Sequence, residues 1–343
     1  MNSFISKALR VLKGEFSFEY ILSYILYRLL CKNKINRSSA KLFRKWDARR
    51  MRFLPTHIQP ITMKTYDGLD QTVHPHVILN DAGVYIMSIT PYPFGDSRYE
   101  NPCVYISQNG VDWSAPEGVS NPLALPEPNG WNHLSDSNII YAHDVYWLYY
   151  RETIHRDTMN VDRIYRIESE DLRQWTVPAL LFETPLNEVM SPSVIRYKDT
   201  YHIYYVCCIN SNSCLKRCMS CNGSFENEEI LHVKGIPQGR MLWHIAIVED
   251  GDLLKGLFVL STGAIGRNSD LFYAESNDGG NHWIIRKKIF ILSNQEKYFN
   301  MIYASSMVKD DAGSWCLFFS AATRHGSWHT FLIRNFDLER NLY

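Results

Sequence analysis

The sequence predicts an all-β fold, a five-bladed β-propeller preceded by an N-terminal helical extension. The first observation is a repeat of five apolar runs, each opening behind polar or tight-turn residues, at steps of 61, 56, 52 and 60 residues. These openings begin at His74, Ser135, Ser191, Trp243 and Tyr303. The second observation is that each opening leads into a run of alternating bulky residues, which is typical of strands. A repeat of this size made of short strands is typical of a propeller with one four-stranded blade per unit.

Four of the five units also close on a small turn motif. The motifs are SQNGVDW (107–113), SEDLRQW (169–175), SCNGSF (220–225) and SNDGGNHW (276–283). In such turns Asp or Asn accepts backbone hydrogen bonds, Gly adopts a positive φ, and the aromatic side chain fills the space between strands. We interpret these motifs as structural and assign them no chemistry.

The chain divides into a basic helical arm, residues 1–54, and the propeller, residues 55–343. Residues 4–30 carry apolar side chains at helical spacing, and a second helix is predicted from about Ser38 to Arg52. The apolar tract from Tyr20 to Cys31 is shorter than the ~20 residues that span a bilayer. After Pro55 the chain alternates turn residues with β-branched and aromatic runs, which indicates strands.

Charge is distributed unevenly although the formal net charge is zero. The arm carries 13 Lys and Arg against three acidic residues, which leaves 23 basic and 33 acidic side chains in the body, from 36 of each in the chain. An acidic body repels phosphates, so nucleic acid is not an expected partner. For the arm three roles stay open: a cap packed on the propeller, peripheral contact with an anionic membrane face, and oligomerisation.

Eight cysteines raise the question of disulfides. The N-terminus lacks the uninterrupted apolar core and the cleavage site of a secretory signal, so we expect reduced thiols and a cytoplasmic location, with the inner face of the membrane as a candidate place. Cys214, Cys218 and Cys221 have a C-x3-C-x2-C spacing found in iron–sulfur enzymes. Because this spacing falls inside a β repeat, we favour thiols that pack as small apolar side chains.

Several of these motifs resemble those of known glycan-acting propellers. SNDGGNHW resembles the Asp-box of sialidases, and SEDLRQW is similar to a blade turn of the arabinanase, β-xylosidase and invertase hydrolases. The openings SDSNIIY and SPSVIRY are similar to the blade starts of the same hydrolases, and the resemblance covers roughly residues 70–330. It implies a five-bladed, glycoside hydrolase-like protein whose partner is a carbohydrate.

The resemblance implies a site in which three carboxylates, from the first three blades, meet on the axis, as in these hydrolases. This chain departs from that pattern, with His74-Pro75-His76 at the first opening and Met190-Ser191-Pro192 at the third. Asp136, in the second opening, is the carboxylate at a blade start. Glycosidic cleavage needs an acid and a second carboxylate, so Asp136 is paired in our hypothesis with Glu188, Glu152 or Glu100.

Other side chains are expected around the same axial funnel. Arg151 and Arg324 are candidates to hold a carboxylate or phosphate of an acidic sugar. The predicted substrate-binding residues are His74, His76, Arg151, Trp243, His244, Tyr303 and Arg324. We expect no cofactor and no metal, although the three histidines together with Asp136 could alternatively bind zinc or iron.

The favoured function is therefore a glycoside hydrolase-like enzyme. Its substrate would be a complex, acidic or lipid-linked surface polysaccharide or a precursor of one. Two alternatives stay open: a non-catalytic glycan-binding or assembly protein that lost the acid and base, and an enzyme that transfers a glycosyl group in cell-surface polysaccharide synthesis.

Overall fold

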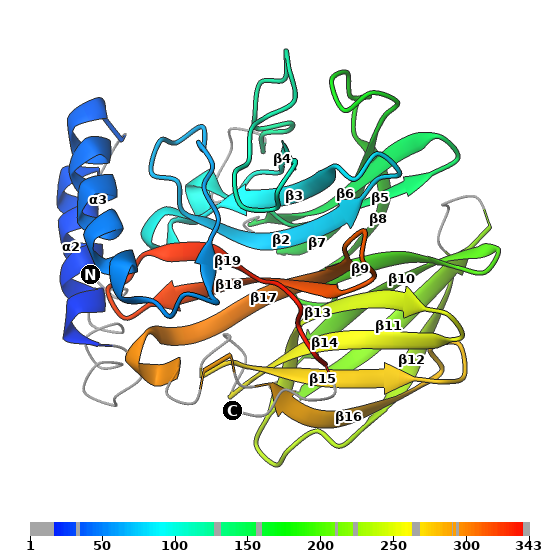
Figure 1. The fold of residues 1–343 in the computed structure, drawn as a ribbon. Coiled ribbons are helices and arrows are strands. Elements are labelled where there is room, and N and C mark those ends of the chain that lie inside the picture. Colours follow the sequence, from blue (N-terminus) through cyan, green and yellow to red (C-terminus); the bar gives the residue numbers. More distant parts are fainter. Residues whose placement is uncertain are drawn as a thin grey trace.

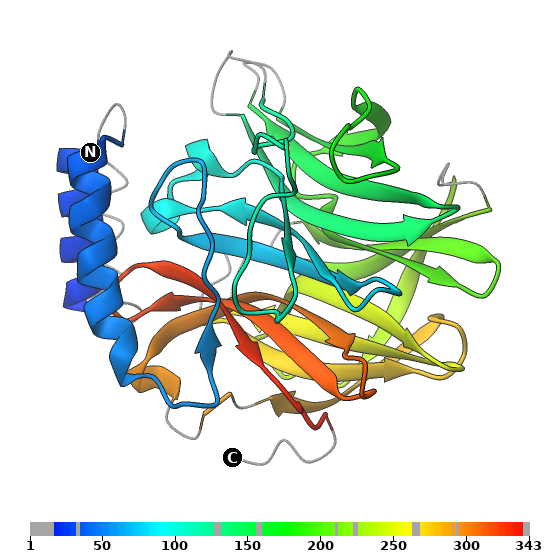
Figure 2. The same ribbon diagram turned by 45° about the horizontal axis from the view of Figure 1, so that its top comes forward.

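The structure is a computed structural model. It describes residues 17–31, 35–126, 132–155, 160–209, 212–221, 226–262, 268–289, 291–292 and 295–338. The first predicted helix is present as α2 (Phe18–Leu30), while its expected beginning, residues 4–16, lies outside the described residues. The second is α3 (Arg37–Arg50), where Asn36 and Ser39 form a capping box. The two helices stand side by side at one edge of the molecule (Figures 1 and 2).

The remaining described residues are mostly β, as predicted. The first three units are β2–β4 (Thr72–Leu79, Tyr85–Pro91, Cys103–Ser107), β5–β8 (His133–Ala142, Val145–Ile154, Val161–Ser169, Ala179–Pro185) and β9–β12 (Met190–Tyr197, Thr200–Ile209, Asn212–Ser220, Glu226–Lys234). The last two are β13–β16 (Met241–Asp250, Leu253–Ser261, Asp270–Ser276, His282–Ile289) and β17–β19 (Phe299–Lys309, Trp315–Thr323, Trp328–Ile333). Short 3₁₀ turns occupy 51–53, 93–95, 97–99 and 295–297.

Within each unit, strands that follow one another in the chain pair antiparallel. The last unit gains a fourth strand from the start of the body, because β1 (Gln59–Pro60) pairs with β19. The parallel pairing of β12 with β16 joins the third and fourth units into one eight-stranded sheet. The first unit has three strands, so the expectation of four strands per unit is wrong there. The segment that follows it (114–130) is rich in proline, and proline cannot donate to a strand ladder.

The first strand of every unit lies against the first strand of the next unit. β2 adjoins β5, β5 adjoins β9, β9 adjoins β13, β13 adjoins β17, and β17 adjoins β2, which closes a ring. Hydrophobic clusters fill the space between neighbouring units, for example Trp147 with Tyr201 and Tyr204 with Trp283. The ring therefore brings the starts of five strands that are distant in sequence to one place.

The closing turns have the predicted internal bonding. The indole nitrogens of Trp113, Trp175 and Trp283 each donate to a backbone carbonyl three residues earlier, at 2.9, 3.2 and 3.1 Å. Asp278 accepts from the backbone nitrogens of Asn281 and His282. Part of the turn over 220–225 lies outside the described residues. The described parts of these motifs therefore have a structural role, because their side chains form hydrogen bonds within the turns.

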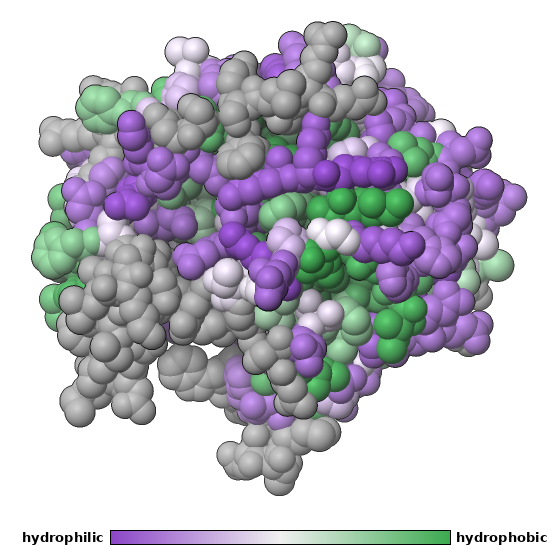
Figure 3. Space-filling model, turned by 90° about the horizontal axis from the view of Figure 1, so that it is seen from below, coloured by the Kyte–Doolittle hydropathy of each residue, from purple (hydrophilic) through white to green (hydrophobic). Residues whose placement is uncertain are grey.

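Viewed from below, hydrophilic side chains cover most of the surface, with hydrophobic side chains in a central band and at the edge (Figure 3). Within the described part of the chain, no helix has both the length and the apolar character needed to cross a bilayer.

One buried histidine gives the fold a predicted dependence on pH. His202 bonds through its ring nitrogens to Thr200 and Tyr204, at 2.9 and 3.0 Å, and burial lowers its pKa to about 4. Between pH 6.5 and 4 the unfolded chain therefore binds a proton that the folded chain does not. Stability should fall as the pH falls through this window, by at most about 1.4 kcal/mol per pH unit for this residue.

Urea unfolding at pH 7 and pH 5 measures this effect. His202→Gln keeps hydrogen-bonding capacity and should lose less stability between the two pH values than the parent protein. His232→Gln, at an exposed histidine, is the matched control and should leave the difference unchanged. An equal loss in the parent protein and His202→Gln would show that His202 is protonated in the folded state.

Candidate active site

The five predicted openings are β-bulges in the inner strands. Relative to their partner strands, extra residues occur at 74–75, 136–137 and 191–192, and at Trp243 and Tyr303. A bulge bends a strand and redirects its side chains, and bulges are common next to active sites. Because the inner strands form a ring, these redirected side chains converge.

Three of these positions have unusual backbone conformations. His74, Asp136 and Ser191 have φ values of 57°, 53° and 50°, which lie in the left-handed region. Residues other than glycine adopt this region at a cost of about 1–3 kcal/mol, and such residues cluster at functional sites. Since none of the three is glycine, we interpret the strain as the cost of keeping these side chains on the axis.

His74, Asp136 and His244 form a tight buried cluster. His74 Nε2 lies 3.0 Å from Asp136 Oδ1, and His244 Nδ1 lies 3.6 Å from the same oxygen. Ligand atoms about 2.1 Å from a tetrahedral ion lie roughly 3.4 Å apart, which is similar to both distances. Among the described residues this is the one group of three that has the spacing of a metal site.

The hydrogen bonds around the cluster leave these atoms unsatisfied. His74 Nδ1 lies 2.9 Å from the Thr90 hydroxyl, which donates to the Val73 carbonyl and so can accept the Nδ1 proton. This bond favours the tautomer of His74 whose Nε2 lone pair faces Asp136. The competing bond, in which Asp136 N donates to Nδ1, is longer, at 3.4 Å. Within the described structure, neither His74 Nε2 nor Asp136 Oδ1 has a hydrogen-bond partner.

The charges point to a cation at this place. Burial lowers the pKa of His74 to about 4 and that of His244 to about 3, so both imidazoles are neutral at pH 7. Burial alone would raise the pKa of Asp136, but Arg151, His74 and His244 hold it below its ordinary value. Two neutral imidazoles and a carboxylate therefore point at one another without a hydrogen bond between them. This set of ligands is suited to zinc or iron. The residues therefore fit a divalent ion.

Arg151 fixes the other side of the carboxylate. Its Nε lies 2.9 Å from Asp136 Oδ2, and its guanidinium also donates to the Ser135 hydroxyl. Asp162, fully buried on β7, lies 3.7 Å from Arg151 and accepts from the Thr153 hydroxyl and from Asn187 N. Arg151 thus leaves Oδ1 of Asp136 directed at the two histidines.

Glu100 lies behind His74, at the end of the segment that leaves β3. Its Oε1 is 3.5 Å from His74 Nδ1, and its side chain is 6% exposed. Burial, reinforced by the nearby Asp136 charge, raises the pKa of Glu100 well above its ordinary value. Burial therefore favours the protonated carboxylic acid form of Glu100, whereas the neighbouring Asp136 favours its ionised form.

Aromatic side chains border the cluster. The Tyr303 ring lies 4.5 Å from the His244 ring and 5.3 Å from the His74 ring, measured between centroids. Trp243, on the bulge before His244, and Tyr303 are both partly exposed, whereas His74, Asp136 and His244 are buried. Trp243 and Tyr303 are therefore the part of this group that reaches solvent, and their faces are suited to stacking on a sugar ring.

The structure separates the other four predicted residues from this cluster. His76 accepts from Ile139 N on the neighbouring unit, and Glu152 lies on the opposite side of β6 from Arg151, 4.0 Å from Arg163. Glu188 is in the turn before β9, partly exposed. Arg324 is in the β18–β19 turn, where its carbonyl accepts from the Ser17 hydroxyl. Their predicted roles in catalysis and binding stay predictions.

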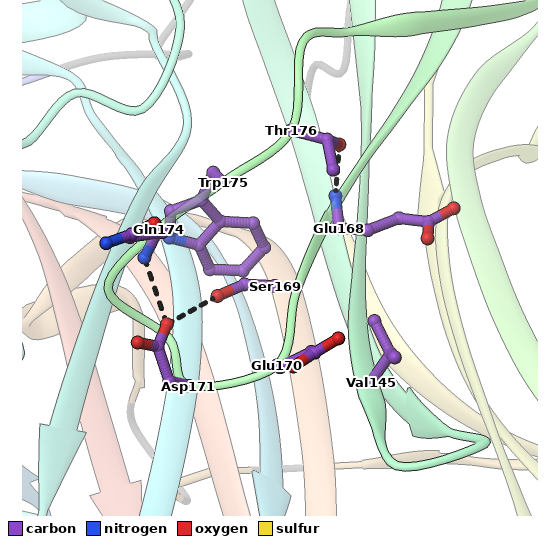
Figure 4. Close-up of a pocket in the computed structure, with 8 residues that line it drawn as sticks. All are labelled: Val145, Glu168, Ser169, Glu170, Asp171, Gln174, Trp175 and Thr176. Carbon is purple, nitrogen blue, oxygen red and sulfur yellow. Dashed lines mark hydrogen bonds between the residues drawn. The ribbon is translucent and has the colours of Figure 1, made fainter.

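One surface pocket, of about 440 Å³, lies elsewhere, over the closing turn of the second unit. Figure 4 shows Asp171 accepting from Ser169 and Gln174, and Thr176 accepting from Glu168 N. These three hydrogen bonds lie within the turn itself. We assign it no chemistry.

Comparison with known proteins finds a similar sequence stretch and solved structures with a similar fold. No protein family profile matches the chain. A stretch of 76 residues, 21% of the chain, is 36% identical to an A type blood N-acetyl-α-D-galactosamine deacetylase of Flavonifractor plautii. The match spans 10% of that protein's length.

Solved structures share the fold over most of the chain. An N-acetylgalactosamine deacetylase from F. plautii, in complex with blood group B trisaccharide, has a TM-score of 0.69 at 17% identity, over 77% of this chain and 89% of that one. A thermostable family-43 glycoside hydrolase has a TM-score of 0.60 at 15% identity over the same shares. A Bacillus subtilis arabinanase has a TM-score of 0.54 at 13% identity, over 77% of this chain and 94% of that one. The predicted resemblance to arabinanase- and xylosidase-type β-propellers is confirmed at the level of fold.

Proposed function

We propose that the five strand units are the blades of a five-bladed propeller whose axial site removes the acyl group from an N-acetylated sugar of a glycan. The observation that carries this proposal is the convergence of His74, Asp136 and His244 on one point of the axis. The similarity to a deacetylase, in both a sequence stretch and the fold, supports the same reaction class.

Amide hydrolysis suits this arrangement of side chains. A divalent ion held by His74, Asp136 and His244 would polarise the acyl carbonyl and lower the pKa of a water molecule. Arg151 and Thr90 keep Asp136 and His74 in the orientation that directs their free atoms to one point. Trp243 and Tyr303, the partly exposed aromatic residues, would bind the sugar ring beside it.

Glu100 is suited to the second half of the reaction. Water adds its oxygen to the carbonyl carbon and loses a proton to solvent, the C–N bond breaks, and the nitrogen leaves as an amine that must receive a proton. Burial next to His74 favours the protonated form of Glu100, so Glu100 is our candidate for the acid that supplies this proton and regains one from solvent afterwards. The products are acetate and a sugar amine.

A second candidate is the glycoside hydrolysis predicted from the sequence. It is favoured by one observation: Glu100 and Asp136 have pKa values shifted in opposite directions, as in an acid and base pair. Against it, Asp136 is held by Arg151 and directed toward two imidazoles rather than toward open space.

The test compares the two reactions on the same glycans. Purified protein is incubated with glycosides of N-acetylhexosamines and with aryl glycosides, and acetate, free amine and reducing sugar are measured. We expect acetate and amine in equal amounts, loss of activity after chelation, and recovery with Zn²⁺, Mn²⁺ or Fe²⁺. Release of reducing sugar that chelators do not affect would instead support glycoside hydrolysis, and binding without either product would support a glycan-binding protein.

Three finer sequence-based hypotheses also stay predictions. They are an acidic or lipid-linked glycan as substrate, glycosyl transfer as an alternative reaction, and a cytoplasmic location.

A further inference from the structure

Helix α2 is apolar on two opposite faces. Its inner face packs on the body through Tyr20, Ile21 and Tyr27, all less than 9% exposed. Its outer face carries five further apolar side chains at helical spacing: Phe18 (71% exposed), Leu22 (41%), Leu26 (36%), Leu29 (72%) and Leu30 (47%). A helix that is apolar all round is normally buried on all sides. The exposure of these side chains shows that the outer face of α2 is not covered by the described residues.

The same helix is fixed to the end of the body where the candidate active site lies. Tyr20 and Ile21 belong to a cluster that also includes Tyr92 and Tyr303, and Tyr303 contacts both histidines of the site. The Tyr27 hydroxyl donates to Asp96, at 2.8 Å, in the loop that precedes Glu100. Whatever covers the outer face of α2 therefore lies at the same end of the molecule as the site.

The surroundings of the outer face are basic. Arg37, Lys41 and Lys45 on α3 are exposed, together with the apolar Leu42. Arg28 on α2 and Arg44 on α3 are also exposed, although they lie 3.9 Å from Asp96 and 3.7 Å from Asp70. The acidic residues described on the two helices are engaged elsewhere: Glu19 pairs with His325 at 2.6 Å, and buried Asp47 accepts from Gln71. Figures 1 and 2 show α2 and α3 adjacent, and Figure 3 shows hydrophobic side chains at the edge on that side.

We propose that the outer faces of α2 and α3 form a docking surface for an anionic lipid bilayer. An apolar stripe flanked by basic side chains is the arrangement by which amphipathic helices bind at the bilayer interface. The positive charge selects an anionic surface over an uncharged one. Together with the proposed function, on which this step rests, the docking surface identifies the substrate class as an N-acetylated glycan attached to the membrane.

Vesicle co-sedimentation of the full chain tests the docking surface without any assay of turnover. We expect the protein to pellet with vesicles of phosphatidylcholine and phosphatidylglycerol at low salt, and to stay in solution with phosphatidylcholine alone or at high salt. Leu22→Glu with Leu29→Glu should weaken binding roughly tenfold or more. Val177→Glu with Ile230→Glu, at side chains 85% and 72% exposed elsewhere on the surface, is the matched control and should bind normally.

A second variant guards against misfolding of the first. Lys41→Glu with Lys45→Glu changes only exposed charges of α3 and should also lose binding to anionic vesicles. Failure of the parent protein to bind anionic vesicles at low salt would overturn the docking surface. So would a dimer, seen by analytical ultracentrifugation, that Leu22→Glu with Leu29→Glu dissociates, because a second copy would then cover the stripe. Deacetylation of a soluble glycoside, measured separately, reports on the proposed function alone.

Discussion

Asp136→Asn is expected to reduce turnover at least about a thousandfold and to remove the bound divalent ion. The carboxylate is the group shared by His74, His244 and Arg151, and the amide that replaces it carries no charge to hold a cation. The structure also predicts a loss of stability of about 3 kcal/mol or more, because Arg151 would keep a largely buried charge with a weakened partner.

The control for this stability loss is Asp162→Asn. Asp162 is the other carboxylate near Arg151 and is also fully buried, but it does not contact the histidines. Asp162→Asn should lose comparable stability and keep the ion. Metal content measured on both folded variants, with unfolding followed in urea, separates the two effects. If Asp136→Asn keeps its ion and its activity while losing stability, Asp136 is a structural residue and the metal site is wrong.

The repeat in the sequence predicted the strand units well because its signal is periodic and local. Alternating bulky residues recur in all five units and closing turns in four, and where they are described they form strands and turns near the expected places. What the repeat did not predict depends on pairing between distant segments. Gln59 and Pro60 carry no strand signal of their own, yet they pair with β19 and complete the last sheet. The parallel join of β12 and β16 is of the same kind.

The candidate site was predicted in position better than in chemistry. The openings predicted that His76 would lie close to His74, Asp136, His244, Trp243 and Tyr303. The structure brings the last five together, because the ends of inner strands meet in a ring, but His76 contacts Ile139 of the neighbouring unit. The weight given to carboxylate pairs placed Glu152 and Glu188 in the site. In the structure Glu152 lies 4.0 Å from Arg163, and Glu188 is in a partly exposed turn before β9. Side-chain direction explains Glu152: neighbours on a strand face opposite sides, so Arg151 and Glu152 cannot both point at the axis.

On sequence alone, the metal-binding arrangement is the less favoured alternative because its ligands have no spacing motif. They come from three different strands, β2, β5 and β13, and the bulges that turn them inward are invisible in the sequence. Thr90 and Asp162, which orient His74 and Arg151, were missed altogether. Thr90 is next to last in β3 and Asp162 is second in β7, and only the register of strand pairing shows what these side chains face.

Glu100→Gln is expected to lower kcat by about 10²–10⁴-fold while the ion and the fold are retained. Glutamine has nearly the same shape as the protonated carboxylic acid, so the contact with His74 is preserved, but it cannot give a proton to the leaving nitrogen. The decisive measurement compares two substrates: an N-acetyl sugar, whose amine must be protonated as it leaves, and an activated aryl acetate, whose phenolate leaves without a proton. Glu100→Gln should slow the first strongly and the second little. An equal loss on both substrates would show that Glu100 acts only by positioning His74, and unchanged kcat on the amide would remove Glu100 from the mechanism.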